Sequence, residues 1–147
     1  MLSGGGTAVA DPAVKVVNFT AAWCSNCAVF DPRLHEAMER HSPEDIQSIT
    51  VDLTGLRGSP DQKSQTIADA KALLVQNNAY YLWEWYGGYT GLAAMISADN
   101  GEPLYCANRA LTTDQISDRL KFATLLARRA PAGRRRPDGP DCPAPLR

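Results

Sequence analysis

The sequence predicts an α/β fold whose elements follow one another in the order β-α-β-α-β-β-α. Three observations predict it: an apolar, β-branched run at 14–20, helical spacing of apolar residues directly after that run, and a turn sequence near residue 100 between two short strand-like segments. The chain of 147 residues is 44% hydrophobic and 21% charged, which is enough for one globular domain and no second core.

The first half of the chain alternates strands with helices. The run at 14–20 has the composition of a buried strand, and the apolar spacing after it predicts a helix over about 24–41. Alternating apolar residues predict a second strand over 46–53. Ser59 is a helix N-cap, followed by proline at the first helical position and glutamine at the third, so a second helix should run past Leu74.

The second half predicts a hairpin and a final helix. Strands are expected over 92–97 and 103–107, because Asn100-Gly101 supplies the positive φ angles of a tight turn between them. Thr112 caps a last helix, whose apolar residues share one face as far as Ala127.

Cys24 and Cys27 lie three positions apart at the start of the first helix. Two thiols at this spacing can close into a disulfide ring, and the helix N-terminus stabilises the thiolate of the first. Cys27, one turn inward and shielded, suits a resolving role. The segment that specifies this chemistry is Trp23-Cys24-Ser25-Asn26-Cys27.

The segment from Val17 to Cys27, with the pattern Trp-Cys-x-x-Cys, resembles the active-site strand, turn and helix of the thioredoxin superfamily. Pro32 matches the proline that kinks the active-site helix in that family. Together with 51–54, the segment is also similar to the C-terminal domain of bacterial transmembrane thiol:disulfide interchange proteins. The resemblance implies a thioredoxin-like three-layer α/β/α sandwich with a central mixed sheet over residues 14–127, protein thiols or disulfides as partners, and no cofactor.

The chain departs from the family pattern at three places. Asn18 stands where thioredoxins carry a buried Asp, and Ala28 stands where a Lys is common, so both charged groups that tune the couple are missing. The cis-proline before the central strand is also missing. We expect a trans bond at Thr90 or Gly91 and a remodelled substrate groove, because a cis bond before a residue other than proline costs about 3 kcal/mol.

Residues 79–89 contain six of the eleven aromatic residues of the chain. In the family fold this segment abuts the cysteine pair, so Trp85, Tyr86 and Tyr89 are candidates for a substrate groove. The alternative is that most of these aromatic residues complete the core, which is the more frequent role of buried aromatic side chains.

The other cysteines and histidines give no second site. Cys106 is expected to be a buried free thiol on a strand, and Cys142 lies where nothing positions it. His35 and His41 are expected at the surface. A single pair of cysteines without a second pair of ligands argues against structural zinc, so no metal site is predicted.

Both ends of the chain are expected to lie outside the domain. Residues 1–13 are predicted to be a flexible segment. Residues 128–147 hold six arginines against two aspartates, a net charge of +4, and five prolines, so a disordered tail is predicted. That tail is a solvated extension or an arm for acidic surfaces. No apolar stretch approaches the length of a membrane span, and we expect a monomer with no nucleic-acid partner. The location is cytoplasmic if the N-terminus is complete and periplasmic if a signal or anchor has been lost.

The leading functional prediction is a thiol:disulfide oxidoreductase, in which Cys24 attacks and Cys27 resolves. The missing proline keeps a second class open, a binder of metal or a metal cluster through the two cysteines. A third class is a redox-inactive binding module whose aromatic groove is the active surface.

Overall fold

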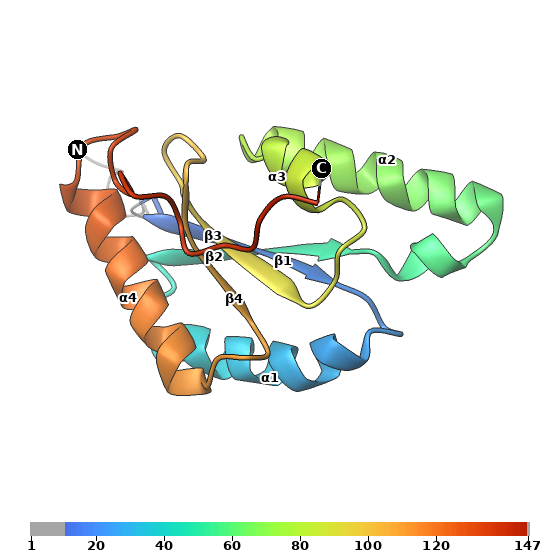
Figure 1. Ribbon diagram of the computed structural model, residues 1–147, viewed down its shortest axis with the longest axis horizontal. Helices are drawn as coiled ribbons and strands as arrows, with labels where there is room; N and C mark the ends of the chain where they lie inside the picture. Colours follow the sequence, from blue (N-terminus) through green and yellow to red (C-terminus); the bar gives the residue numbers. More distant parts are fainter. Residues whose placement is uncertain (1–10, 147) are drawn as a thin grey trace, which may run out of the picture.

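The computed structural model describes residues 11–146 of the protein, so most of the predicted N-terminal flexible segment lies outside the described residues. In this part of the chain four strands form one mixed sheet with helices on both faces (Figure 1). The predicted α/β sandwich and its element order are confirmed, with two short helical additions described below.

Strand β1 (Val14–Thr20) lies inside the sheet, whose strand order is β2-β1-β3-β4. It runs parallel to β2 (Ile46–Asp52) and antiparallel to β3 (Leu92–Ser97), which pairs in turn with β4 (Pro103–Asn108). All seven residues of β1 pair with β2, and six of them pair with β3. The end of β1 is therefore held on both sides before the chain turns towards the first helix.

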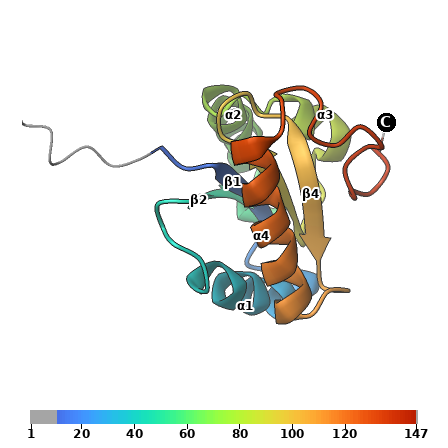
Figure 2. The ribbon, with the colours of Figure 1, turned by 90° about the vertical axis from the view of Figure 1, so that its left-hand side faces the viewer.

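Helices α1 (Ser25–Glu39) and α4 (Thr113–Arg129) cover one face of the sheet (Figure 2). Apolar residues on this face form a buried cluster because strand residues at alternate positions meet the apolar stripes of the two helices. The largest of these side chains are Phe30, Leu34, Met95, Leu104, Ile116 and Leu120.

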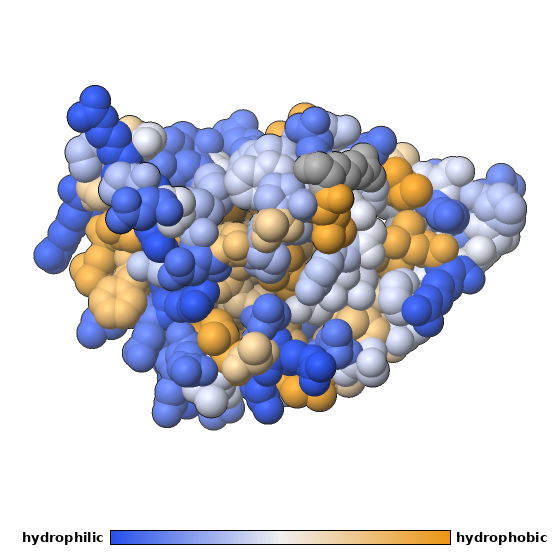
Figure 3. Space-filling view, viewed as in Figure 1, coloured by the Kyte–Doolittle hydropathy of each residue, from blue (hydrophilic) through white to orange (hydrophobic). Residues whose placement is uncertain are grey.

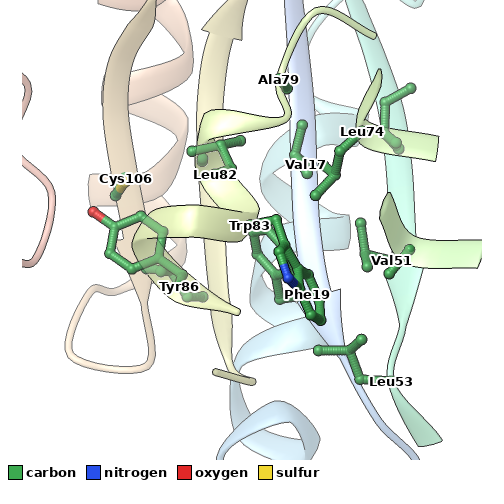
Figure 4. Close-up of a cluster of buried hydrophobic side chains, with 14 of the residues drawn as sticks. Val17, Phe19, Val51, Leu53, Leu74, Ala79, Leu82, Trp83, Tyr86 and Cys106 are labelled. Carbon is green, nitrogen blue, oxygen red and sulfur yellow. The ribbon is translucent and has the colours of Figure 1, made fainter. Parts of the chain in front are cut away.

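The opposite face is covered by α2 (Pro60–Gln76) and the short α3 (Tyr81–Tyr86). The turn of 3-10 helix η2 (Thr54–Arg57) joins β2 to α2. Aromatic and branched side chains from the strands and helices interlock on this face (Figure 4). The residues in the close-up include Val17, Phe19, Val51, Leu53, Leu74, Leu82, Trp83 and Tyr86.

Both predicted helix caps are confirmed. Ser59 accepts a hydrogen bond from Gln62 N, and the Gln62 side chain accepts one from Ser59 N, which is a complete capping box. Thr112 and Gln115 make the same reciprocal pair at α4. Each box satisfies backbone donors that no helical carbonyl can reach.

The β3–β4 hairpin is present with a looser turn than predicted. Gly101 has a φ of 77°, whereas Asn100 is not among the residues with positive φ. Ser97 N still donates to Glu102 O across the hairpin. A Cβ at Gly101 would lie 2.1 Å from Asn78 O, so this position excludes any side chain.

The expectation of a disordered C-terminal tail needs correction. Residues 130–146, here called the C-terminal strap, run back across the molecule along the outer edge of β4 and reach α3 (Figures 1 and 2). Asp141 pairs with Tyr105 on β4, and a disulfide joins Cys106 to Cys142, with 4.8 Å between their Cα atoms. The one large aliphatic residue of the strap, Leu146, is exposed, so the order of the strap comes from this disulfide and from polar contacts.

Arg135 is the main polar anchor of the strap and is 6% exposed. Its guanidinium donates to Asp99 Oδ2 at 2.7 Å and to Glu102 Oε1 at 2.8 Å, both in the β3–β4 turn region. It also donates to Ala127 O and Ala130 O at the end of α4. A cation here satisfies helix carbonyls and two carboxylates together.

In residues 11–146 no helix has the length and apolar character needed to cross a membrane.

We predict that Asp99→Asn lowers the free energy of unfolding at neutral pH by about 1 kcal/mol, a small figure because the Asp99 side chain is 56% exposed. The Arg135 hydrogen bond lowers the pKa of Asp99, so its stabilisation is fully present above the ordinary aspartate range and is lost progressively as the pH falls from that range through the lowered pKa of the folded state. Urea unfolding at pH 7 and at about pH 3 measures the difference. Asp138→Asn, at an exposed site in the strap, is the control. An equal loss at both pH values would contradict the prediction.

Candidate active site

Cys24 is the N-cap residue of α1, as predicted from the sequence. Its backbone is extended, with φ −85° and ψ 108°, and its sulfur accepts a hydrogen bond from Cys27 N at 3.1 Å. The first turn of the helix carries no acidic residue. The unpaired N–H groups and the positive end of the helix dipole therefore face this sulfur without an opposing charge.

Cys24 and Cys27 form a disulfide, with 5.2 Å between their Cα atoms. Cys24 is 8% exposed and Cys27 is 1% exposed. The two sulfurs thus differ in access, and an incoming thiol or disulfide reaches Cys24 more readily.

A cavity of about 440 Å³ opens beside the pair. Its lining includes both cysteines, Asp31 and Pro32 of α1, and Asp52 at the end of β2. Pro32 lies inside α1 as predicted and is exposed. The cavity has room for water and brings the carboxylates of Asp31 and Asp52 to the same opening as the cysteine pair.

Asp31 is a functional candidate that the sequence analysis missed. Its carboxylate accepts hydrogen bonds from Asn18 Nδ2 at 3.1 Å and from Thr20 Oγ1 at 2.7 Å. Thioredoxins carry an aspartate at the position of Asn18. In this protein the Asn18 side chain instead donates a hydrogen bond to the carboxylate of Asp31 on α1. The available signal was helical spacing, because a residue four positions after Cys27 lies on the same side of α1.

Asn18 is 8% exposed, and its Oδ1 is a buried acceptor without a hydrogen-bond partner in the described residues. Both hydrogen bonds end on the carboxylate of Asp31, a residue of α1. The negative charge that the strand lacks is therefore supplied by the helix.

Gly91 lies directly against the cysteine pair. It has a φ of 84°, and a Cβ at this position would lie 3.1 Å from Asn26 Cβ and 3.8 Å from Cys24 Sγ. Gly91 N donates to Phe19 O at 2.8 Å, which ties Thr90 and Gly91 to the end of β1. The expected trans bonds are confirmed, since residues 11–146 contain no cis peptide bond.

Trp23 is half-buried beside the pair. Its Nε1 donates to Thr54 O at 2.8 Å, and the Arg57 guanidinium lies 3.8 Å from the ring centroid. A cavity of about 510 Å³ is bounded by Trp23, Arg57 and residues of α2. Arg57 and this cavity were not predicted. Ser25 and Asn26, between the cysteines, are exposed.

The three aromatic groove candidates do not share one surface role. Tyr86 is fully buried, and its hydroxyl donates to Pro143 O of the strap at 2.6 Å. Trp85 packs edge-on against Tyr81 and lies beneath the strap, where Leu146 N donates to its carbonyl. Tyr89 is half-buried, two residues from Gly91. Tyr86 is therefore a core residue and does not line a groove. The segment 81–86 forms the helix α3, which the sequence did not predict.

The histidines lie apart from the cysteine pair. His35 is exposed, and His41 Nε2 is 3.0 Å from Ser117 Oγ on α4. In the part of the chain that the structure describes, no three His, Cys, Asp or Glu side chains gather in a group that could hold a metal ion.

The prediction for Cys106 needs correction, because this residue is paired with Cys142 rather than free. The sequence indicated a buried position, which is confirmed by its 2% exposure. The pairing was not visible because a sequence separation of 36 residues hides the proximity of the two cysteines in the fold.

Comparison with known proteins places this geometry in a family. The thioredoxin family model matches residues 7–82, more than half of the chain. No curated protein sequence matches it.

Among solved structures, the chain is similar to three thioredoxin-like proteins. With StoA from Bacillus subtilis it shares 16% identity, covering 74% of this chain and 83% of that one, with a TM-score of 0.47. With a secreted Mycobacterium tuberculosis disulfide oxidoreductase homologous to E. coli DsbE it shares 14% identity, with coverages of 76% and 82% and a TM-score of 0.46. With the exposed lipoprotein thioredoxin of Streptococcus pneumoniae it shares 22% identity, with coverages of 76% and 85% and a TM-score of 0.47. On the extent of the family match, the chain belongs to the thioredoxin family.

Proposed function

We propose that the protein is a thiol:disulfide oxidoreductase that uses Cys24 and Cys27 as its redox couple. The observation that carries the proposal is the position of the Cys24 sulfur, which caps α1 and accepts the backbone N–H of Cys27. The same hydrogen bond and helix dipole stabilise a thiolate at Cys24 when the pair is reduced.

The reaction follows from the unequal access of the two sulfurs. The Cys24 thiolate attacks a disulfide of the partner protein, and a mixed disulfide forms while one partner thiol leaves. Cys27, buried one turn further along α1, then attacks the Cys24 sulfur and releases the second partner thiol. Two electrons pass to the partner, and the Cys24–Cys27 disulfide is restored. The reverse sequence oxidises a partner dithiol.

Asp31 is proposed as the acceptor of the Cys27 proton. A thiol must lose its proton before it can attack, and the carboxylate of Asp31 lines the same cavity as Cys27. Water in this cavity can carry the proton between the two groups. Asn18 and Thr20 hold the carboxylate with hydrogen bonds, so its orientation is set before reaction.

Gly91 is proposed to leave room for the partner chain. Without a side chain, this residue keeps the space beside Cys24 Sγ open, although no proline is present there. Trp23, next to Cys24 in the chain, and Tyr89, two residues before Gly91, are partly buried and are proposed to offer apolar surface to a peptide. In the described residues, no specific observation favours the metal-binding or the redox-inactive alternative.

We predict that Cys27→Ser traps a covalent complex with a disulfide-bonded substrate, whereas Cys24→Ser forms none and abolishes turnover. The serine at 27 cannot resolve the mixed disulfide, while the serine at 24 removes the attacking sulfur. Non-reducing mass spectrometry after mixing with oxidised insulin detects the complex. The Cys106→Ser/Cys142→Ser variant is the control and should keep its turnover. Trapping by Cys24→Ser instead would reverse the assigned roles.

We predict that Asp31→Asn slows release of the substrate from the mixed disulfide by about tenfold to a hundredfold at pH 7, because general-base assistance is lost. The deficit should shrink above about pH 9, where the thiol ionises without help. Rapid mixing with thiol detection measures the step. Asp52→Asn is the matched control, since Asp52 lines the same cavity but its carboxylate is bound by Thr54. If Asp31→Asn released the substrate faster than the unmodified protein, the Asp31 carboxylate would be shown to hinder ionisation of Cys27, which would contradict a role as proton acceptor.

We predict that Asn18→Asp destabilises the protein by about 1–3 kcal/mol at pH 7, because two carboxyl groups would meet where an amide now lies 3.1 Å from Asp31. One of the pair would have a raised pKa, so the loss should diminish as the pH falls towards 5. The exchanged variant Asn18→Asp/Asp31→Asn restores one acid and one amide and should recover most of the stability. Urea unfolding compares the three proteins, and equal stability of the single and double variants would contradict the pairing.

A further inference from the structure

The C-terminal strap has two halves that are held in different ways. The first half, as far as Arg136, is anchored without any help from the disulfide: Arg135 is buried among carboxylates and helix carbonyls, and Arg136 donates to Leu104 O at 2.8 Å. Arg136 also lies 4.1 Å from the Tyr105 ring centroid. This half is fixed to β4, to the β3–β4 turn and to α4.

The second half of the strap, residues 137–146, makes few hydrogen bonds with the rest of the molecule. Its hydrogen bonds to the rest of the molecule include Cys106 N to Asp141 O at 3.2 Å, Tyr86 Oη to Pro143 O, and Leu146 N to Trp85 O at 2.8 Å. Most of its side chains are exposed or half-buried. Gly139, with a φ of 89°, makes the turn into this half, and an added Cβ there would meet no atom within 4 Å, so the turn does not pack against the domain.

The Cys106–Cys142 disulfide closes this half onto β4 and borders a cavity of about 410 Å³. Cys106 is 2% exposed, while Cys142 is half-buried, so an incoming thiolate reaches the Cys142 sulfur first. Figure 3 shows that the face of the molecule that includes β4 is largely hydrophilic, with scattered hydrophobic residues. A polar thiol reagent or protein can therefore approach it.

Arg119 lies next to the bond on the β4 side. Its Nη1 donates to Cys106 O at 2.7 Å and to Asp141 O at 3.2 Å, and the residue lines the same cavity. A guanidinium beside a sulfur stabilises the thiolate form, and a stabilised thiolate is a better leaving group. Cleavage at Cys142 would release Cys106 as the anion into the cavity that Arg119 also lines.

We propose that Cys106–Cys142 is a second thiol–disulfide exchange site, a clasp that a dithiol reductant opens while the protein stays folded. A thiolate of the reductant attacks Cys142 Sγ, the bond between the two sulfurs breaks, and the electron pair leaves on Cys106 Sγ, which takes up a proton. The second thiol of the reductant then attacks the reductant's own bonded sulfur and forms its disulfide. Cys142 leaves as a thiolate and is protonated.

Opening of the clasp frees residues 137–146 and leaves the first half of the strap in place. The outer edge of β4 then loses its pairing with Asp141, and Tyr86 loses its acceptor in the strap. Edge backbone groups and an aromatic surface become exposed together. The inference stands independently of the proposed function of Cys24 and Cys27, because it rests on different sulfurs and on a different cavity.

The test uses the full chain carrying Cys24→Ser/Cys27→Ser, so that only the clasp can react. The folded variant is incubated with dithiothreitol, and free thiols are alkylated and identified by mass spectrometry. We expect both Cys106 and Cys142 to be labelled without urea, with near-UV circular dichroism retained. Labelling only after unfolding would overturn the proposal and make the bond a permanent staple.

Hydrogen exchange on the same sample locates the change. The amides of Cys106 and Leu146, which donate to Asp141 O and Trp85 O, should exchange at least tenfold faster after reduction, whereas those of residues 133–136 should not change. The Cys106→Ser/Cys142→Ser variant should match the reduced protein without any reductant. Unchanged exchange at Cys106 and Leu146 after reduction would overturn the release of the strap. The Cys24→Ser/Cys27→Ser variant lacks the proposed redox couple, so a negative result in this test concerns the Cys106–Cys142 disulfide alone. It leaves the proposed oxidoreductase activity of Cys24 and Cys27 untouched.

Discussion

Pairing of β1 on both of its sides is the constraint on which the rest of the structure depends. Parallel pairing with β2 runs through all seven residues of β1, and antiparallel pairing with β3 runs through six of them, so the strand is held on both sides nearly to its end. The chain then turns through Ala21 and begins α1 at Cys24, so the sulfur takes its position from the backbone of the sheet. Gly91 reaches the same place because its N–H is bonded to Phe19 at the end of β1.

The charge of the site illustrates how a loss at one position is balanced at another. Asn18 removes an acid from the strand, and Asp31 supplies one from the facing helix, with the amide as its hydrogen-bond donor. An amide and a carboxylate form a stable pair at this distance, whereas two carboxylates would repel. The amide at position 18 and the carboxylate at position 31 therefore explain each other, because each residue type fits only in the presence of the other.

The sequence predicted the core elements and the cysteine pair because each has a local signal. Strand alternation, the caps at Ser59 and Thr112 and the thiol spacing all lie within a few residues of one another. The helix at 81–86 was missed because its cluster of aromatic residues has no cap and no clear helical period. Asp31 was overlooked because its partners lie on another element.

The strap was predicted to be disordered because its composition offers little apolar area to bury. Its order comes from contacts that composition does not reveal: one arginine surrounded by acceptors and one disulfide to a distant strand. Composition measures how much hydrophobic surface a segment can bury. It does not reveal whether distant residues of the fold provide a cluster of hydrogen-bond acceptors that can bind a buried arginine.

The path of the strap also changes the covalent connectivity of the molecule. Residues from Cys142 onward are joined to the domain along the backbone and, separately, through sulfur to β4. The exposed Pro137 and Asp138 lie between Arg135 and Cys142, where a protease has access. A single cut there would leave the distal fragment attached through its disulfide, so the covalent mass of the oxidised molecule would change only by the water added at the cut.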